Sequence, residues 1–447
     1  MQHADHLPAH EWLGPWLKGF PERLPTMRRV DIGRHGLSLR DADLPLPLAV
    51  IRQDALHHNL GWMQRFAEQQ GVALAPHGKT TMSPQLFQKQ LAAGAWGLSF
   101  ATVYQLRQGV AAGARRVLLA NQLCSLSDLA SLLQIRREHA GSTPLTLAFF
   151  VDSMAQLDLI EAHWARLGAE QSGEARLDVL IEIGSSRCGV RNPEDALALA
   201  RRLWGHTALR LRGLAFYEGL EARGMHEGDR ALMLGWEHRL NTVLEALESE
   251  GLVEEDARPL WLSGGGSALF DLVAPLLRGS LPPKAERPER LGLLRSGCYV
   301  CHDHGLYERM RHVMDERLSR TALGGADLRP ALEVWCEVIS CPEPGLALLN
   351  AGRRDVSFDQ GWPLPVWHAV LADRFARQAA PQGWQISGLN DQHAYLRWDP
   401  AQAATPSVGD RVALGPSHPC TTFDKWSWMA MVDEQDRVVD AITTQFG

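Results

Sequence analysis

Features that would place this 447-residue chain at a membrane or on nucleic acid are missing from its sequence. No stretch of about 18 apolar residues occurs, which is the length that a membrane-spanning helix needs. The first residues show no basic segment followed by an apolar one, so no secretory signal is expected. The net charge is −7, and an acidic surface is a poor match for nucleic acid or an anionic membrane. We therefore expect a cytoplasmic protein with neither kind of partner.

Cysteine is sparse, and one common glycine motif is absent. Seven cysteines, an odd number in a long chain, fit reduced thiols better than a disulfide framework. No Gly-x-Gly-x-x-Gly follows an early strand-like run, so a dinucleotide-binding open sheet has no support. The remaining composition, 45% hydrophobic and 22% charged, is ordinary for a globular protein. The length leaves room for two or three domains.

Strand-like and helix-compatible segments alternate through the middle of the chain. Eight apolar runs read as buried parallel strands, at Val72–Lys79, Trp96–Ala101, Arg116–Asn121, Leu145–Asp152, Leu177–Ser185, Leu209–Gly219, Leu260–Ser267 and Leu291–Val300. Amphipathic helices suit Asp54–Gln70, Val103–Ala112, Ser127–Glu138, Met154–Leu167, Pro193–Trp204 and Asp229–Ser249. Such alternation predicts βαβ units, and eight strands close a (β/α)8 barrel, which we place at residues 53–305. A doubly wound open sheet is the alternative.

The remaining residues, 1–52 and 306–447, predict a second domain of β structure. Short strand-like runs split by Gly, Pro, Asp and Asn occur at Leu332–Ile339, Gly345–Leu349, Trp384–Gly388, Ala394–Trp398, Val412–Leu414 and Arg437–Thr443. A further apolar run at Leu48–Ile51 precedes the eight barrel strands, so we expect it to pair with this second domain. The chain is thus predicted to be an α/β protein with an N-terminal TIM-like barrel and a C-terminal antiparallel β domain.

Lys79 stands at the carboxyl end of the first predicted barrel strand. The pair Ser83-Pro84 then supplies an N-cap and a first-turn proline, so Lys79 lies between a strand and a helix. In α/β barrels this is the catalytic face. A lone lysine is ordinarily a solvated charge, but this one is enclosed by Gly78 and Thr80 beside a buried strand. A desolvated lysine can form a Schiff base, so Lys79 is a candidate for holding an aldehyde cofactor.

Three consecutive glycines, Gly264, Gly265 and Gly266, followed by Ser267, end the seventh predicted strand. Without side chains, their backbone N–H groups can approach an anion closely. Phosphate sites commonly form at this end of a barrel. A flexible turn is the alternative interpretation.

Other strand ends carry side chains that suit a ligand. Arg187 ends the fifth strand and is placed to contact a phenolate or carboxylate. Tyr217 ends the sixth and could contact a planar ring, although core filling explains it equally well. Cys298, Cys301 and His302 resemble a metal cluster, but a lone Cys-x-x-Cys lacks the second pair that a zinc ribbon needs.

His418 and Cys420 form the second distinctive feature. In an extended segment, residues two apart point to the same side. The pair could therefore bind one soft or borderline divalent ion such as zinc. A metal site needs at least a third protein ligand, and Asp391-Gln392-His393 is a plausible source of it. A buried cysteine beside a surface histidine is the alternative.

From about Leu44 to Trp428, the chain resembles the D-serine dehydratase (D-serine deaminase) and D-threonine aldolase family, pyridoxal-phosphate enzymes of the alanine-racemase-like fold type III. The motifs that carry the resemblance are Pro-His77-Gly-Lys79-Thr80, Arg187-Cys-Gly-Val, Tyr217-Glu-Gly, the glycine run, Gly297-Cys298-Tyr299, Asp-Gln-His393 and His418-Pro-Cys420. One departure is Ala75, where the family often has arginine before Pro-His.

The resemblance implies a role for each motif. Lys79 would form the Schiff base with pyridoxal phosphate, and the glycine run with Ser267 would hold its phosphate. The ring would lie among His77, Arg187, Tyr217, Cys298 and Tyr299. His418 and Cys420 would be metal ligands, while Thr80 and His393 would lie near the substrate or behind the ligands. The resemblance also implies a homodimer.

The reaction implied is dehydration of a D-β-hydroxy amino acid, D-serine first, to a 2-keto acid and ammonia. Lys79 would act as base at Cα, and the metal would act as Lewis acid on the β-hydroxyl. The His-x-Cys pair resembles the zinc-dependent dehydratase branch, since the aldolase branch has Asp at the second place. A D-threonine-type aldolase and a 3-hydroxyaspartate-type dehydratase remain alternatives within the class. A non-catalytic pyridoxal-phosphate carrier would need no metal pair, and a racemase would use two bases.

Overall fold

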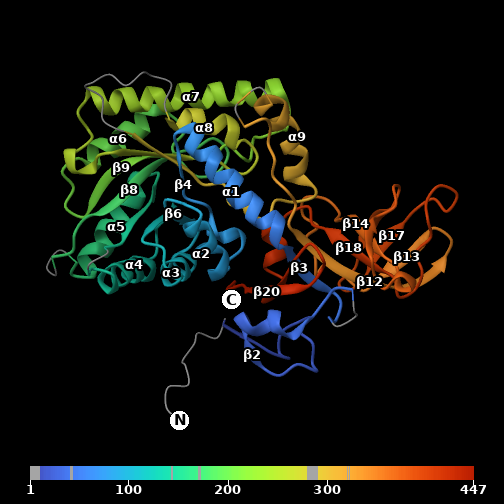
Figure 1. Ribbon diagram of the computed structural model, residues 1–447. Helices are drawn as coiled ribbons and strands as arrows, with labels where there is room; N and C mark the ends of the chain where they lie inside the picture. Colours follow the sequence, from blue (N-terminus) through green and yellow to red (C-terminus); the bar gives the residue numbers. More distant parts are fainter. Residues whose placement is uncertain are drawn as a thin grey trace, which may run out of the picture.

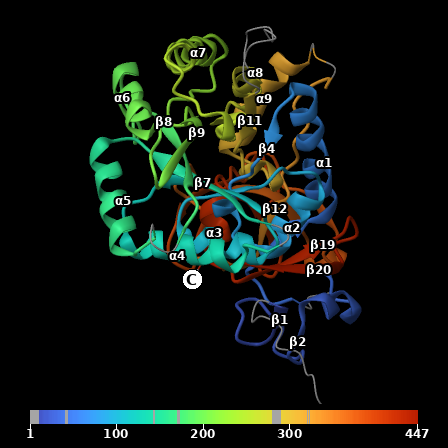
Figure 2. The same ribbon diagram turned by 90° about the vertical axis from the view of Figure 1, so that its left-hand side faces the viewer.

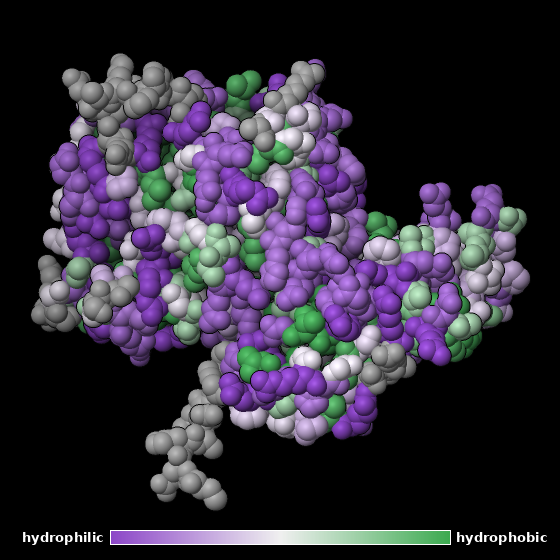
Figure 3. All heavy atoms as spheres, viewed as in Figure 1, coloured by the Kyte–Doolittle hydropathy of each residue, from purple (hydrophilic) through white to green (hydrophobic). Residues whose placement is uncertain are grey.

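The architecture is described from a computed structural model that covers residues 11–40, 44–141, 144–169, 173–278, 290–319, 321 and 323–446. A barrel of parallel strands occupies one side of the molecule and an antiparallel sheet the other (Figure 1). The predicted fold class, a TIM-like barrel followed by an antiparallel β domain, is confirmed. No helix in the described part of the chain is long and apolar enough to span a bilayer. The visible face is mostly hydrophilic, with small hydrophobic areas scattered over it (Figure 3).

Eight parallel strands form the barrel, and each lies within or overlaps one of the predicted runs. They are β4 (Ala73–Leu74), β5 (Leu98–Phe100), β6 (Arg116–Gln122), β7 (Thr146–Val151), β8 (Leu177–Ile183), β9 (Leu209–Phe216), β10 (Leu260–Gly264) and β11 (Arg290–Leu294). The hydrogen-bonded order runs from β4 through β11 and back to β5. A parallel bridge between His77 and Ser99 brings the ends of β4 and β5 together, which closes the ring.

Helices surround these strands (Figure 2). They are α1 (Gln53–Gln70), α2 (Pro84–Ala92), α3 (Val103–Ala111), α4 (Leu126–Glu138), α5 (Met154–Arg166), α6 (Pro193–Leu203), α7 (His226–Ser249) and α8 (Phe270–Arg278). Five of them begin at a side chain that accepts a backbone N–H from the first turn, namely Ser83, Thr102, Ser125, Ser153 and Asn192. Short polar caps therefore set where each crossover leaves its strand.

The barrel interior is filled by side chains, as in other closed barrels of this size. A separate cluster of fully buried residues comes from strands β6 to β11: Leu118, Ala148, Phe150, Leu180, Ala215, Trp261 and Leu293. Phe150 also lines the cavity described below. The floor of that cavity is therefore the top layer of the barrel core.

The second domain is a ten-stranded sheet built from both ends of the chain. Its strands are β3 (Leu48–Arg52), β12 (Leu332–Glu343), β13 (Leu346–Leu349), β14 (Leu364–Ala369), β15 (Arg377–Ala379), β16 (Gln385–Leu389), β17 (Ala394–Arg397), β18 (Arg411–Gly415), β19 (Trp428–Val432) and β20 (Val438–Thr443). Strand β3 pairs antiparallel with β12 and parallel with β19, as its position before the barrel predicted. A small N-terminal unit, β1 (Trp12–Leu13), β2 (Met27–Arg28) and the 3₁₀ helix η2 (Arg29–His35), lies against β20 (Figure 1).

Two segments differ from the expectation. The region after residue 305, predicted as all β, begins with helix α9 (Leu306–Leu318), which is rich in charged residues and buries little of its surface. The eighth barrel strand ends at Leu294 rather than Val300. The polar Arg295 and Ser296 follow it, and Cys298–Val300 form a 3₁₀ turn, η5. The division at residues 53–305 stays a prediction.

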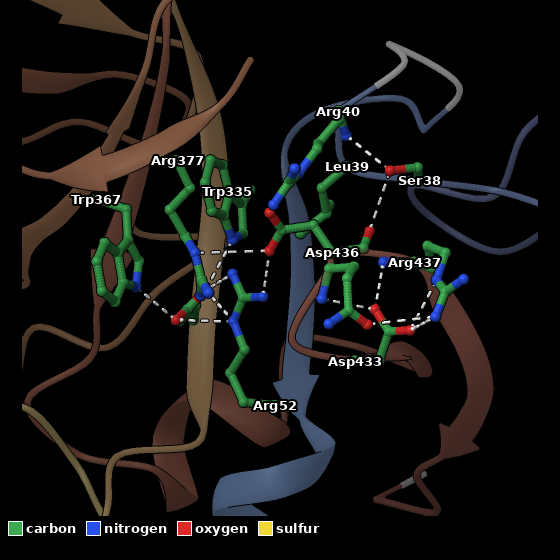
Figure 4. Close-up of polar contacts among 12 residues, drawn as sticks. Ser38, Leu39, Arg40, Arg52, Trp335, Trp367, Arg377, Asp433, Asp436 and Arg437 are labelled. Carbon is green, nitrogen blue, oxygen red and sulfur yellow. Dashed lines mark hydrogen bonds and ion pairs between the residues drawn. The ribbon is translucent and has the colours of Figure 1, made fainter. Parts of the chain in front are cut away.

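A buried ion network joins β3 to the C-terminal sheet (Figure 4). The Arg52 guanidinium donates three hydrogen bonds to Glu333, at 3.1, 3.0 and 2.8 Å, and one to Asp436 at 2.5 Å. The indole N–H groups of Trp335 and Trp367 donate to the two Glu333 oxygens, each at 2.8 Å. Burial alone would raise the pKa of Glu333, but the Arg52 guanidinium holds it below its usual value. The carboxylate is therefore charged and fully satisfied.

Replacing Arg52 with alanine is expected to lower the free energy of unfolding by about 3–5 kcal/mol, because the buried Glu333 carboxylate loses its cation and Asp436 loses one of its cations. Arg40 offers a matched control: it also binds Asp436, at 3.0 Å, but its side chain is 43% exposed. Arg40→Ala should cost about 1 kcal/mol or less. Urea unfolding of both variants measures the difference. Equal losses would show that the buried network adds nothing beyond a surface ion pair.

Candidate active site

A cavity of about 680 Å³ opens where the carboxyl ends of the barrel strands face the β domain. Its walls come from the segments after β4, β8, β9, β10 and β11, from helix α9, and from the His418–Cys420 segment. This volume is within the usual range for a small-molecule site. Most of the side chains predicted from the sequence as functional meet here.

Lys79 lies on a single 3₁₀ turn, η3 (Gly78–Thr80), directly after β4, and its side chain reaches the cavity. Gly78 permits this turn to pack, because a Cβ there would lie 2.3 Å from the Phe100 ring. Beside the lysine, the Nδ1 atom of His77 is buried without a hydrogen-bond partner among the described residues. Burial, helped by the neighbouring Lys79, holds the pKa of His77 well below its usual value. His77 is thus a neutral imidazole, and its Nδ1 is unpaired among the described residues.

The glycine run forms one corner of the cavity. Gly265 has a φ of +90°, a conformation that favours glycine, and the following Gly266 N–H donates to the Glu218 carboxyl group at 2.8 Å. Ser267 faces the cavity as well, and its Oγ accepts the Cys298 N–H at 3.1 Å. A buried carboxyl group on the Gly266 N–H acts as a stand-in for an oxyanion, so this corner suits a phosphate.

Two residues of this corner were not predicted from the sequence. Glu218 is fully buried, its Oε2 has no partner among the described residues, and burial raises its pKa. Arg295 is also buried; it donates to Ser263 Oγ at 2.8 Å and to the Phe216 carbonyl at 2.7 Å. The signal that could have identified Arg295 is a charged residue directly after an apolar barrel strand.

Tyr217 and Arg187 form the adjoining part of the wall, where a Cβ on Gly266 would lie 2.9 Å from the Tyr217 ring. The Arg187 guanidinium lies over the Tyr217 ring, 5.1 Å from its centroid. Burial and the neighbouring Glu218 raise the pKa of Tyr217 to about 12, so its phenol stays protonated. A planar ligand between these groups and Lys79 would contact a cation, a phenol and an amine.

The His418–Cys420 segment reaches the cavity from the β domain. His418 Nδ1 bonds to Asp359 Oδ2 at 2.6 Å, which leaves Nε2 for a cation. A histidine held by a carboxylate in this way is a common arrangement behind metal ions. Cys420, at the start of helix α10 (Cys420–Phe423), places its Sγ 3.5 Å from Thr80 Oγ1 and 3.5 Å from Cys298 Sγ. Asp359 was not predicted, because it lies 59 residues from His418 in a segment without periodicity.

Three predicted contacts are not brought to the cavity. His393 is exposed on the turn between β16 and β17 and does not line the cavity. Tyr299 points into the core, where its hydroxyl accepts from Gln90 at 3.4 Å. Gly264 ends β10 below the cavity, and a Cβ there would meet the Phe216 ring at 2.4 Å. For Tyr299 and Gly264 the cause is the same: neighbouring residues of one turn face different sides, and sequence spacing does not show which side.

A second acidic and thiol cluster lies at the edge of the same cavity. One ligand atom each from Asp152, Glu182 and Cys188 lies within 4.8 Å of the others, and it is the one such group of three found among the described residues. Gln122 Nε2 donates to Glu182 at 2.5 Å, and the Gly189 N–H donates to Asp152 at 2.9 Å. These two carboxylates are therefore already engaged within the protein.

Comparison with known proteins places this site in a family. The family described as "Alanine racemase, N-terminal domain" matches residues 51–268, and the one described as "Putative serine dehydratase domain" matches residues 331–432. A D-threo-3-hydroxyaspartate dehydratase from Delftia sp. (strain HT23) is 30% identical over 393 residues, 85% of this chain and 92% of that protein. The chain belongs to the D-serine dehydratase and D-threonine aldolase family.

Other members of this family cover nearly the whole chain. A D-threonine aldolase from Arthrobacter sp. is 26% identical over 406 residues, 90% of this chain and 92% of that protein. A solved structure of the D-threo-3-hydroxyaspartate dehydratase, a cysteine-to-alanine variant in a metal-free form, is 26% identical with a TM-score of 0.68. It covers 92% of this chain and 100% of that one. The family is one of pyridoxal-phosphate enzymes that act on D-amino acids.

The residues present fit both groups that the family implies. An amine, an oxyanion corner without side chains and an aromatic wall suit pyridoxal phosphate. An imidazole oriented by a carboxylate, next to a thiol, suits a borderline or soft divalent ion such as zinc.

Proposed function

We propose that this protein is a pyridoxal-phosphate- and metal-dependent dehydratase of D-β-hydroxy amino acids, with D-serine as the first substrate to test. Pyruvate and ammonia would then be the products. The observation that carries the proposal is the convergence of Lys79 from the barrel with His418 and Cys420 from the β domain on one cavity. This elimination needs an amine that binds the aldehyde of the cofactor and two side chains that hold a metal ion near the substrate hydroxyl.

When bound, pyridoxal phosphate stabilises negative charge at Cα, and a divalent cation polarises the β-hydroxyl group. Lys79 Nζ is the group we assign to covalent attachment of the cofactor and to accepting the Cα proton. Lys79 lies on the short turn η3, where Gly78 packs against Phe100. This packing keeps the amine in the cavity, at the carboxyl end of β4. That restriction reduces the entropy cost of positioning the base.

Two residues near Lys79, Tyr217 and His77, each have one protonation state at neutral pH. Tyr217 keeps its phenolic proton at neutral pH, since its pKa is about 12, and can donate a hydrogen bond. His77 carries no charge, because burial lowers its pKa, and its Nδ1 can accept one. Arg187 is assigned to an anionic group of the ligand, either the substrate carboxylate or a ring oxygen. The polarity of the wall thus favours one orientation of a planar ligand.

Asp359 has a positioning role on the metal side. Its Oδ2 accepts from His418 Nδ1, and its Oδ1 accepts from Thr421 Oγ1 at 2.7 Å. The imidazole is therefore held in the tautomer that leaves Nε2 unprotonated. Cys420 supplies a sulfur ligand, which supports zinc over magnesium at this position.

Aldol cleavage is the second candidate, because a D-threonine aldolase matches 90% of the chain. Cys420 favours dehydration, as the resemblance of the His-x-Cys pair to the dehydratase branch implies. A 3-hydroxyaspartate-type substrate would bring a second carboxylate, and Arg187, an exposed cation of the cavity wall, could receive it.

The experiment is a panel of D- and L-serine, D-threonine and both 3-hydroxyaspartate diastereomers, with ammonia, keto acid, glycine and aldehyde assayed in parallel. Ammonia and keto acid from a D substrate, with L-serine turned over far more slowly, are the expected result. Aldehyde and glycine would identify an aldolase instead. Comparable turnover of D- and L-serine would contradict the stereochemical assignment, and no product from any substrate would favour a carrier.

A further inference from the structure

Two cysteine thiols from different domains meet in the cavity. Cys298 follows β11 of the barrel, Cys420 begins α10 of the β domain, and their sulfurs lie 3.5 Å apart although 122 residues separate them. The chain has seven cysteines, and those in the described residues are free. The cavity wall thus holds a preformed pair of thiols beside the expected metal position.

Both sulfurs are held by their backbones rather than by flexible side chains. The Cys298 N–H donates to Ser267 Oγ at 3.1 Å, and the residue lies on the buried turn η5 with 5% of its surface exposed. Cys420 lies on a helical turn, and its Sγ contacts Thr80 Oγ1 at 3.5 Å. Only the χ1 dihedral angle moves the sulfur of a cysteine, so a fixed backbone leaves each sulfur few alternative positions.

The spacing is that of two ligands of one cation. Two sulfurs bound to a tetrahedral zinc at about 2.3 Å each lie about 3.8 Å apart. The observed 3.5 Å is close to this distance. His418 does not complete a group of three atoms all within 4.8 Å of one another, so a shift of its ring toward the sulfurs is the one adjustment that a shared cation requires.

We propose that Cys298 is a third protein ligand, which with Cys420 and His418 gives the cation two thiolates and one imidazole. The inference deepens the metal site of the proposed function and rests on it. A divalent cation displaces the two thiol protons, which leave to solvent, and no electron is transferred. One tetrahedral position remains for a substrate hydroxyl. The cation then ties the barrel to the β domain, and the site selects zinc or cadmium over magnesium or manganese.

Cys188 provides the control, because it lies in the same cavity beside Asp152 and Glu182 and could bind a soft cation there. The probe is Cd²⁺ titrated into the full-length protein after chelation under reducing conditions. The ultraviolet thiolate-to-cadmium absorbance is recorded for the wild type, Cys298→Ser, Cys420→Ser and Cys188→Ser. Since two thiolates are expected, each of the first two substitutions should remove about half of the absorbance at saturation. Cys188→Ser should leave it unchanged.

The cadmium titrations distinguish the possible sets of metal ligands. Full absorbance in Cys298→Ser would overturn the third ligand while leaving the His418–Cys420 site intact. Loss of absorbance in Cys188→Ser would place the cation at the cluster of Asp152, Glu182 and Cys188 and overturn the proposal. No cadmium absorbance in the wild type would refute the metal site of the proposed function as well.

Alkylation of the wild type gives a second measurement that needs no variant to fold. Stoichiometric Zn²⁺ should protect two thiols, and mass spectrometry should identify them as Cys298 and Cys420. Protection of Cys420 alone would overturn the assignment of Cys298.

Discussion

Lys79→Ala is expected to abolish turnover, with a loss of about 10⁴-fold or more. A positioned general base alone contributes about 10²–10⁴-fold, and the substitution also removes the covalent attachment point of the cofactor. The fold should be unaffected, because the Lys79 side chain reaches into the cavity and makes no buried contact that the barrel needs. Addition of a small primary amine should restore part of the activity, which a merely structural loss would not allow.

Attachment can be measured without turnover. The protein is incubated with pyridoxal phosphate, reduced with borohydride and mapped by mass spectrometry. The chain has five lysines, Lys18, Lys79, Lys89, Lys284 and Lys425, and the pyridoxyl group should be found on Lys79. Lys89→Ala, in the neighbouring helix α2, is the control and should label as the wild type does. Label on any other lysine in the wild type would refute the assignment.

Metal removal should stop dehydration but not the earlier chemistry at Cα. Hydroxide is a poor leaving group, and Lewis-acid assistance is worth several kcal/mol, so chelation or Cys420→Ala should slow ammonia release by about 10³-fold. The visible spectrum of the cofactor and exchange of the Cα hydrogen with deuterated solvent should persist. Asp359→Asn should weaken metal affinity by about 10–100-fold through the orientation of His418.

Cys341→Ser is the matched control for that experiment, because Cys341 is an exposed cysteine of the same domain outside the cavity. It should retain full activity. The protein should remain folded after chelation, since a core of this size does not depend on one metal as a small zinc module does. Full dehydratase activity of Cys420→Ala after exhaustive chelation would leave a buried cysteine as the explanation of the motif.

The barrel could be predicted because its strands are buried on both faces. Such strands read as continuous apolar runs; β7 to β10 each fall within one, and β6 and β11 overlap one. Lys79 and the glycine run followed from the same pattern, since the residue after each run marks the catalytic face. Helix α9 could not be predicted in this way, because it is mostly charged and its apolar side is narrow.

Long-range pairs explain the rest of what the sequence did not reveal. Asp359 and His418 meet across 59 residues and Cys298 and Cys420 across 122, with nothing in the local pattern of either segment to connect them. Tyr299 shows the converse limit. It stands in a recognisable motif, yet the 3₁₀ turn η5 directs it to the core while Cys298 faces the cavity. Spacing identifies a turn, but only its backbone dihedral angles decide which side chain faces the ligand.

Strand β3 has a consequence for the order in which the protein is made. It is synthesised before the barrel, yet its two partners, β12 and β19, follow β3 itself by about 280 to 380 residues in the chain. At roughly 5–20 residues per second, the ribosome needs tens of seconds to supply them. Throughout that time β3 offers two unpaired edges of apolar residues, a known hazard for association between chains. The nascent chain should therefore depend on a holding chaperone until β19 emerges, whereas the finished protein should not.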